Sequence, residues 1–229
     1  MHDYTFFVTS TINSPHGKFS VDERFNQTVD GLASIRRKVP NCQILLFDNS
    51  IEPLNQNQTA TLKSMVEVYK QYDHNLFSRF VNINNFNKGL GELLMMEQAL
   101  PIIKNSMMPA KRIFKMSGRY KLTDNFNIAN YETDYLKGKY SFLQTVWAFS
   151  NDNFQNNNYL TFNETRLWSF CSSLFLEVEQ SIQTIFNYML NKQHNIEVAI
   201  NHCLASDKVV VLPKLDIEGY FFSGEFRQE

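Results

Sequence analysis

The first half of the sequence alternates short apolar segments with longer segments whose apolar residues recur at helical spacing. The short segments are rich in β-branched and aromatic residues and cover residues 4–10, 43–47, 80–83 and 112–116. Strands in which apolar and polar residues do not alternate are typical of a parallel sheet buried on both faces. The segments between them provide the crossover helices that parallel strands need. The sequence therefore predicts an α/β fold with a mostly parallel sheet flanked by helices.

Helix boundaries in this half are marked by specific residues. Ser20 and Glu23 have the spacing of a capping box, which predicts a helix of about 18 residues. Further helices are expected over residues 59–72 and from about residue 87, and the apolar face of the last one is interrupted at Pro101.

The second half has a different pattern. In chain order we expect a strand over 140–149, an asparagine-rich loop over 151–163, a helix over 174–189, a shorter helix over 195–204 and a strand over 209–212. The tail, 216–229, is expected to be irregular and able to fold back over a site. A chain of 229 residues that keeps one alternation of elements is expected to form a single domain.

Charge and cysteine usage restrict the partners. The 22 Lys and Arg residues balance 23 Asp and Glu residues, so no sequence-wide attraction to nucleic acid or anionic membrane is expected. No apolar stretch approaches the roughly 20 residues of a spanning helix, and Asp3 does not fit the basic start of a signal peptide. The three cysteines form no metal-binding pair and are expected to be reduced. These features favour a cytoplasmic protein without a zinc site, and its oligomeric state stays open.

Common enzyme motifs are missing. Gly89-Leu90-Gly91 lacks the third glycine of a dinucleotide fingerprint and follows the wrong strand for one. The sequence contains no phosphate-binding Walker motif, no Gly-x-Ser-x-Gly elbow and no His-Glu-x-x-His motif. Phosphate-loop enzymes and the hydrolases that sequence alone identifies are therefore disfavoured.

Polar residues occur where the expected strands end or a helix begins. They are Thr9, Ser10, Asp48, Asn87, Lys88, Ser117, Gly118, Arg119 and, at a later helix start, Glu197. Each one alone also fits a plain structural role, as a turn residue, a solvated cation or a carboxylate at a helix N-terminus. Together they fall where the carboxyl edge of one parallel sheet would place them, and such sheets bind ligands at that edge.

These residues resemble the GT-A-type glycosyltransferases, a family with a Rossmann-type sheet that uses nucleotide sugars. The resemblance covers most of the chain and implies one GT-A-like domain over 1–229, with a nucleotide-sugar-binding half over 1–122 and an acceptor-side half over 123–229. The first strand with its helix, and the second strand ending in Asp48, are similar to the family's nucleotide-binding start. In that family the acid after the second strand meets the base or ribose.

Two further segments carry the resemblance. Asn87-Lys88-Gly89 is similar to the Asn-x-Gly element that lines the diphosphate side in this fold. Asn195-Ile196-Glu197 resembles the segment in which inverting members carry their catalytic acidic residue.

One departure from the family stands out. Where its members carry the Asp-x-Asp motif that holds Mg²⁺ or Mn²⁺, this chain reads Ser117-Gly118-Arg119, and Asp-x-Asp occurs nowhere in it. A metal-independent reaction is therefore expected, with Mg²⁺ or Mn²⁺ left open, and Arg119 is the first candidate to stabilise the departing diphosphate. Lys88 and Lys115 are expected to assist.

The resemblance implies transfer of a sugar from a UDP- or GDP-sugar to a hydroxyl of a glycan or polysaccharide. The acceptor hydroxyl needs a base, and Glu197 is the first candidate for it, with Asp152 second. Two alternatives stay open. A sugar nucleotidyltransferase shares a similar α/β start but normally carries a glycine-rich, arginine-containing loop after its first strand, whereas residues 13–18 hold one glycine. A non-catalytic module that binds nucleotides or carbohydrates is the other alternative. The donor base, the sugar, the acceptor and the stereochemical outcome are not fixed by the sequence.

Overall fold

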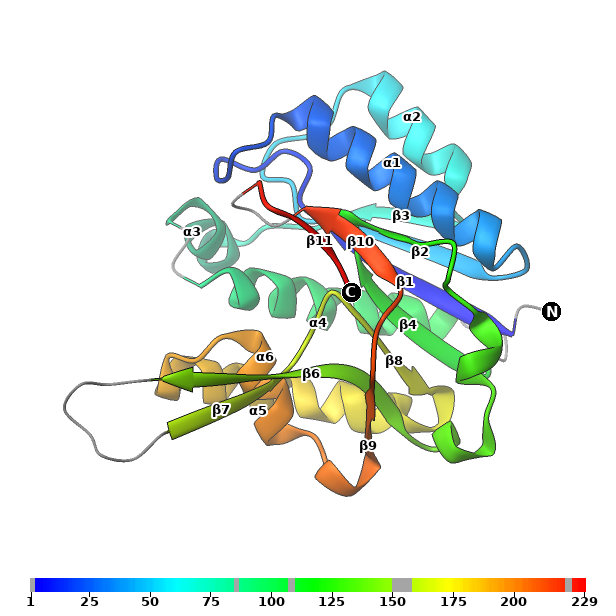
Figure 1. Ribbon diagram of the computed structural model, residues 1–229. Helices are drawn as coiled ribbons and strands as arrows, with labels where there is room; N and C mark the ends of the chain where they lie inside the picture. The colour runs from blue at the N-terminus through cyan, green and yellow to red at the C-terminus, as the bar shows by residue number, and fades with distance from the viewer. Residues whose placement is uncertain (1–2, 85–86, 107–109, 150–157, 221–223) are drawn as a thin grey trace.

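The computed structural model describes residues 3–84, 87–106, 110–149, 158–220 and 224–229. Within these residues the chain forms a mixed sheet of eight strands with helices on both faces, and a small second sheet of three strands. Figure 1 shows the main sheet running through the body of the molecule, with α1 and α2 on one side and α4, α5 and α6 on the other. The predicted α/β fold with a mostly parallel sheet is confirmed.

The first half contains the parallel part of the sheet. Its elements are β1 (Tyr4–Ser10), α1 (Val21–Lys38), β2 (Gln43–Asp48), α2 (Gln56–Met65), β3 (Val68–Gln71), α3 (Leu76–Asn84), α4 (Lys88–Ser106) and β4 (Arg112–Ser117). β1 pairs in parallel with both β2 and β4, in a register that sets Ser10 opposite Asp48 and Thr9 opposite Ser117. The carboxyl ends of these strands therefore meet at one edge, as the sequence predicted.

The capping box at the start of α1 is present. The Ser20 hydroxyl accepts a hydrogen bond from the backbone N–H of Glu23 at 3.2 Å, and the Glu23 carboxylate accepts one from the N–H of Ser20 at 2.7 Å. The bonds satisfy two backbone donors that a helix N-terminus otherwise leaves without partners. They fix where the loop after β1 ends.

The expected strand over 80–83 is wrong, because these residues belong to α3. The Asn75 side chain accepts a hydrogen bond from Ser78 N at 2.8 Å, which caps this helix. The next parallel strand is instead β3, inside the segment 59–72 that was expected to be helical. β3 is held in part by Glu67, whose carboxylate accepts from the N–H of Ile44 in β2 at 2.6 Å.

The helix expected from about residue 87 contains Pro101, where its apolar face was expected to be interrupted. α4 continues through Pro101 to Ser106. Leu100 and Ile103, on either side of the proline, are buried in the core. Their burial stabilises the helix beyond the hydrogen bond that proline cannot donate.

The second half adds antiparallel strands to the sheet and one more parallel strand. Its elements are β5 (Tyr120–Leu122), β6 (Tyr140–Phe149), β7 (Asn158–Asn163), β8 (Leu167–Cys171), α5 (Phe175–Lys192), α6 (Ile196–Cys203), β9 (Val209–Leu212), β10 (Ile217–Tyr220) and β11 (Phe226–Gln228). Short 3-10 helices cover Ile128–Tyr131, Asp134–Leu136, Ser172–Leu174 and Ser206–Lys208. In the described residues the order of the main sheet is β3-β2-β1-β4-β8-β6-β7, and β9 pairs with β6.

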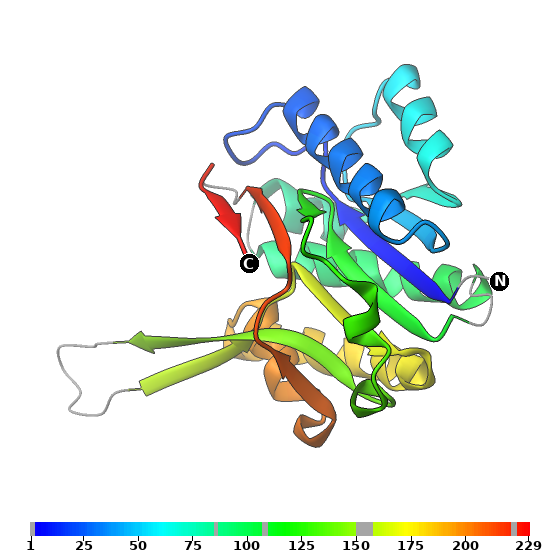
Figure 2. The ribbon, with the colours of Figure 1, turned by 45° about the vertical axis from the view of Figure 1, so that its right-hand side comes forward.

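Two expectations for this half need correction. The last part of the expected loop 151–163 is β7, which pairs antiparallel with β6, and Figures 1 and 2 show this pair extending away from the body. The tail is not irregular, because β10 and β11 form a hairpin that pairs with β5. It does fold back beside the segment that follows β4. β7 is held by β6, the strand just before it, whereas the hairpin of the tail is held by β5, about a hundred residues earlier in the chain.

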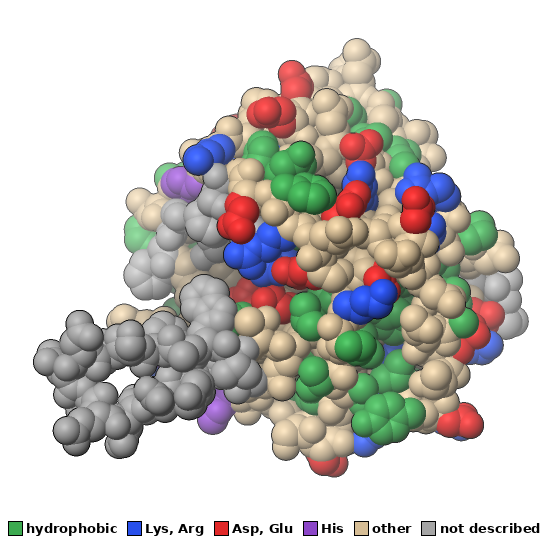
Figure 3. All heavy atoms as spheres, in the orientation of Figure 1, with side chains coloured by type: hydrophobic (Ala, Val, Ile, Leu, Met, Phe, Trp, Pro, Cys, Tyr) green, Lys and Arg blue, Asp and Glu red, His purple; other side chains and the backbone are tan. Residues whose placement is uncertain are grey.

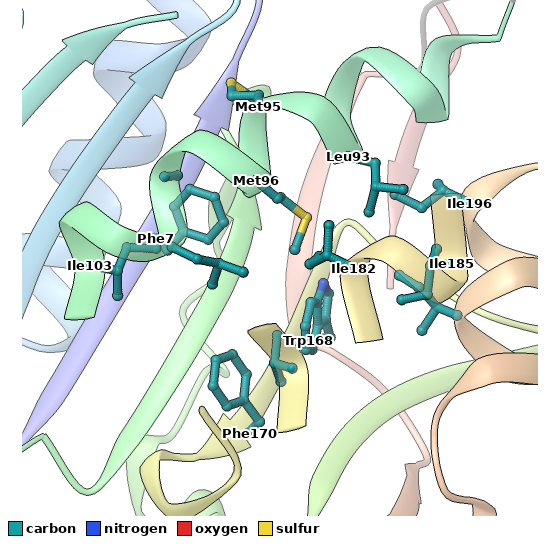
Figure 4. Packing of buried hydrophobic residues seen from close by; sticks show 14 of the residues in the cluster. Phe7, Leu93, Met95, Met96, Ile103, Trp168, Phe170, Ile182, Ile185 and Ile196 are labelled. Atoms are coloured by element: carbon teal, nitrogen blue, oxygen red, sulfur yellow. The ribbon is translucent and has the colours of Figure 1, made fainter. Parts of the chain in front are cut away.

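Side chains of the central strands alternate between two apolar clusters, one on each face of the sheet. Phe7 in β1 packs with α4, α5 and α6, and Figure 4 shows it near Met96 and Ile103, in the cluster that also holds Trp168. Its neighbour Phe6 packs on the opposite face with residues of α1 and α2. A strand buried on both faces explains the continuous apolar runs of the sequence. No helix in the described residues combines the length and the apolar character needed to cross a bilayer.

Candidate functional site

A pocket of about 160 Å³ opens at the edge where β1, β2 and β4 end. It is lined by the end of β1 and the loop after it, the residue after β2, one face of α3, the start of α4, and the segment after β4. The lining residues are Thr9, Ser10, Thr11, Ser14, His16, Arg24, Asn49, Val81, Asn82, Glu92, Met95, Ser117, Gly118 and Arg119. Five of the predicted site residues, Thr9, Ser10, Ser117, Gly118 and Arg119, therefore meet in one pocket.

Asp48 lies beneath this pocket and does not line it. Its side chain is fully buried and accepts hydrogen bonds from the Ser10 hydroxyl at 2.8 Å and from the N–H of Ile12 at 3.1 Å. Burial raises the pKa of the Asp48 carboxyl. In this arrangement Asp48 ties the end of β2 to the loop after β1, and so it positions the pocket wall.

Arg24 is a pocket residue that the sequence reasoning missed. From α1 it reaches into the loop after β1 and donates hydrogen bonds to three backbone carbonyls, those of Thr11 at 3.1 Å, Phe19 at 3.2 Å and His16. The loop is thus folded around a buried guanidinium. An arginine in the first turn of the first helix was the available signal, but the sequence did not show that the loop would close around it.

Arg119 differs from Arg24 because its guanidinium forms no hydrogen bond and no ion pair with the described residues. It is half-buried and lines the pocket. Burial lowers the pKa of the Arg119 guanidinium, and burial together with the Arg119 charge lowers that of Arg24. Two guanidinium groups close enough to repel each other make the pocket suited to an anion.

Lys115 is placed differently from the sequence expectation. Its side chain is 1 % exposed, and its ammonium donates to the carbonyl of Thr165 at 2.7 Å and to the Ser117 hydroxyl at 3.3 Å. It also forms an ion pair with Glu92. An ammonium has three donors, and three partners occupy them here. Lys115 therefore holds the pocket wall together rather than facing the pocket.

Glu197 lies in the first turn of α6, outside the lining of the pocket. Its carboxylate accepts a hydrogen bond at 3.1 Å from the hydroxyl of Thr165, the residue whose carbonyl binds Lys115. Burial raises the pKa of Glu197, and the charges of Glu92 and Glu164 raise it further. A carboxyl group with a raised pKa is a better proton acceptor at neutral pH than an exposed one.

The two glycines at the start of α4 are explained by packing. A Cβ on Gly89 would lie 2.7 Å from Cβ of Ile196, so this glycine lets α4 approach α6. A Cβ on Gly91 would lie 2.4 Å from Oδ1 of Asn82, which pairs with the amide of Asn49 at 3.0 Å. These close approaches account for Gly-x-Gly without a phosphate at the helix start.

Three other predicted residues, Asn87, Lys88 and Asp152, lie outside the pocket lining or outside the described part of the structure. The Asn87 side chain donates to the carbonyl of His194 at 3.1 Å and accepts from the N–H of Gly89 at 3.0 Å, which fixes α4 to the turn between α5 and α6. Lys88 begins α4, but its side chain lies outside the described part. Asp152 lies outside the described residues altogether.

The donor set of the pocket does not match a divalent cation. Mg²⁺ and Mn²⁺ bind mainly carboxylate and other oxygen ligands. In the described chain the pocket lining contains one carboxylate, Glu92, and Lys115 already pairs with it. Nowhere in that part of the chain do three or more His, Cys, Asp or Glu side chains group in a way that could hold a metal ion. Figure 3 shows acidic and basic side chains intermixed on the face of the molecule that it displays.

Comparisons with solved structures identify the fold. The chain is similar to core-mannan synthase A from Aspergillus fumigatus in its Mn/GDP form, with a TM-score of 0.55 and 11% identity over 95% of this chain and 74% of that one. It is similar to the galactosyltransferase LgtC in complex with donor and acceptor sugar analogs, with a TM-score of 0.52 and 9% identity over 91% and 72% of the two chains. No protein-family model matches the sequence, and comparison with curated proteins gives no match.

A nucleotidyltransferase has a comparable likeness. For 4-diphosphocytidyl-2C-methyl-D-erythritol synthase from Anaerococcus prevotii the TM-score is 0.53 and the identity 10%, over 92% of this chain and 86% of that one. The chain thus has a GT-A-like α/β fold, similar to the folds of these glycosyltransferases and this nucleotidyltransferase. At these identities the likeness establishes the fold, and the activity must be argued from the pocket.

Proposed function

We propose that this protein is a glycosyltransferase that moves a sugar from a nucleoside-diphosphate sugar to a hydroxyl group of a glycan acceptor. The observation that carries the proposal is the half-buried Arg119 guanidinium, which has no hydrogen-bond or ion-pair partner in the described residues and lies where parallel strands of a GT-A-like sheet end. A cation kept without a partner in a pocket has the charge that a diphosphate requires.

In the proposed reaction, the acceptor oxygen forms a bond to the anomeric carbon and the bond from that carbon to the diphosphate breaks. The electron pair of the broken bond stays on the leaving oxygen, and Arg119 stabilises the charge that develops there. Arg24 adds positive charge to the same pocket. The proton of the acceptor hydroxyl passes to a base, for which Glu197 is the first candidate because its pKa is raised. Asp152 remains the second candidate.

The proposal includes metal independence. Arg119 occupies the segment in which related folds would carry Asp-x-Asp, and the described lining lacks the carboxylates that would coordinate Mg²⁺ or Mn²⁺. A guanidinium can replace a metal at a diphosphate because it is always charged and donates hydrogen bonds in a planar fork. We therefore expect activity to persist in EDTA.

The experiment measures release of UDP or GDP from a panel of nucleotide sugars, with and without glycan acceptors and with and without EDTA. Arg119→Ala should lower turnover by about a hundredfold or more, the usual effect of removing one donor to a developing anion. Arg37→Ala is the matched control, since Arg37 is an exposed arginine on the outer side of α1. Full activity of Arg119→Ala would remove Arg119 from the mechanism. Binding of nucleotide sugars without turnover would favour a non-catalytic module.

A sugar nucleotidyltransferase is the second candidate, and Arg24 is the observation that favours it. Enzymes of that kind carry an arginine in the loop after the first strand, and here Arg24 enters the same loop from α1. The two functions differ in their substrates. A nucleotidyltransferase would release pyrophosphate from a nucleoside triphosphate and a sugar 1-phosphate, whereas a glycosyltransferase would not. Measuring pyrophosphate with these two substrates separates the candidates.

A further inference from the structure

Glu92 is an acidic side chain in a pocket that is otherwise arranged for an anion. It projects from α4, lines the pocket together with Arg119, and is 23 % exposed. A carboxylate beside a bound diphosphate would repel it. Two features of the structure make Glu92 compatible with an anion site.

The first feature is the buried cation behind Glu92. Lys115 pairs with the Glu92 carboxylate and is itself fixed by the carbonyl of Thr165 and the hydroxyl of Ser117. The Lys115 charge offsets that of the Glu92 carboxylate, and Lys115 fixes the direction of the carboxylate because it cannot move without losing its other two partners. A carboxylate whose charge is offset in this way can face the pocket without excluding a diphosphate.

The second feature is the place of Glu92 between two groups of the proposed mechanism. Thr165 connects Lys115, which holds Glu92, to Glu197, because its carbonyl accepts from Lys115 and its hydroxyl donates to Glu197. On the other side, Glu92 shares the pocket lining with Arg119. The Glu92 carboxylate lies near enough to affect both groups. It partly offsets the lowering of the Arg119 pKa by burial, and it adds to the rise that burial causes in the pKa of Glu197.

We infer that Glu92, held in place by Lys115, accepts hydrogen bonds from hydroxyl groups of the transferred sugar. The inference rests on the proposed function, which sets the diphosphate at Arg119 and the base at Glu197. The sugar is attached to the diphosphate on one side and approached by the base on the other, so it lies between them, as Glu92 does. A carboxylate accepts hydrogen bonds without donating any, and sugar hydroxyls are the donors that suit it. Glu92 is thus the residue that distinguishes a nucleotide sugar from a bare nucleotide.

The test compares the affinities for UDP and GDP with those for UDP-glucose and GDP-mannose, measured by calorimetric titration. The readout is the ratio of the dissociation constant of each nucleotide sugar to that of its parent nucleotide, because this ratio isolates the contribution of the sugar. Glu92→Gln should raise this ratio about tenfold, because the nucleotide sugar loses affinity while the parent nucleotide does not. A tenfold change corresponds to about 1.4 kcal/mol. Glu97→Gln is the matched control, since Glu97 is an exposed glutamate on the same helix.

A second variant controls for the unpaired Lys115 ammonium that Glu92→Gln leaves behind. Glu92→Gln combined with Lys115→Met removes both charges of the buried pair and should show the same change in ratio. A further measurement uses the unchanged protein. Donors that each lack one sugar hydroxyl should include at least one that binds about tenfold more weakly than the parent donor, since a site built for a hydroxyl rejects its absence. Glu92→Gln should not discriminate against that donor.

The outcomes separate the inference from the proposed function. If the protein binds nucleotides and nucleotide sugars, and Glu92→Gln leaves the ratio unchanged, the inference is wrong and the proposed function stands. If every deoxy donor binds as well as its parent, the inference is again overturned. If the protein binds neither UDP, GDP nor their sugars, the proposed function fails and the inference falls with it.

Discussion

Replacing Lys115 by methionine perturbs the ion pair on which the pocket wall depends. The Lys115 ammonium lies 2.7 Å from the Thr165 carbonyl oxygen, bonds Ser117 and pairs with Glu92, in surroundings that leave its side chain 1 % exposed. Methionine has a similar length and no charge. The variant therefore fills the space while it leaves the Glu92 carboxylate without a counter-ion.

The magnitude follows from the burial of the two partners. Removing one partner of a buried ion pair costs roughly 3–5 kcal/mol of unfolding free energy. Glu92 is 23 % exposed, so water can solvate part of the carboxylate and the lower figure applies. We expect Lys115→Met to lose about 3 kcal/mol, and a shift of about 2–4 °C for each kcal/mol lowers Tm by about 6–12 °C.

The assay is urea unfolding of the wild type, Lys115→Met, Glu92→Gln and the double variant. The double variant should be more stable than the sum of the single losses predicts, by about 1–3 kcal/mol, because it leaves no unpaired charge. Lys104→Met is the control, since Lys104 forms an exposed pair with Glu179. If Lys115→Met unfolds within about 0.5 kcal/mol of the wild type, or if the single losses add, the ion pair does not hold the wall.

Three more predictions concern single residues of the site. Gly91→Ala places a Cβ 2.4 Å from Oδ1 of Asn82, a residue that lines the pocket. Displacing Asn82 should weaken the proposed nucleotide binding several-fold in titrations, while the circular dichroism spectrum stays unchanged. Burial gives Glu197 a folded pKa above its unfolded value, so its stabilising contribution is present below the unfolded pKa and lost as the pH rises through the folded one. Glu197→Gln should therefore match or exceed the wild-type Tm at pH 8 and lose that advantage near pH 4, while the loss of sugar transfer that the proposed function implies should persist at every pH. Arg24→Lys keeps the positive charge but loses the three hydrogen bonds that the guanidinium donates to backbone carbonyls of loop 11–19. Limited proteolysis should therefore cut that loop faster than in the wild type.

The position of the pocket could be predicted from the sequence because it depends on a regular feature of the backbone. Parallel strands end at the same edge, and the in-register pairing of β1 with β2 and β4 brings Thr9, Ser10 and Ser117 to it. The start of α1 could be predicted for a similar reason. A capping box is a local interaction between residues three positions apart, and Ser20 and Glu23 meet however the rest of the chain packs.

The roles of the charged residues could not be predicted, because their partners are distant in the sequence. Lys115 and Arg119 stand four residues apart in the sequence. Lys115 binds Glu92 and Thr165, whereas the Arg119 guanidinium has no hydrogen-bond or ion-pair partner in the described residues. The error over 80–83 has a different source. The apolar run there fits a helix or a strand equally well, and the parallel strand beside β2 is instead β3, which is only four residues long.

The hairpin of β10 and β11 has a consequence for the order in which the molecule is completed. Arg119 is followed directly by β5, whose Tyr120 pairs with Gly219 about a hundred residues later in the chain. β1, β2 and β4, which form the centre of the sheet, are present in the first 117 residues. A chain that leaves the ribosome N-terminus first can therefore assemble the sheet around β1 early, whereas the backbone that carries Arg119 gains its last hydrogen bonds only after residue 219 has been made. Folding of the scaffold and completion of the pocket are then separate events, and the second cannot finish until β10 has been synthesised.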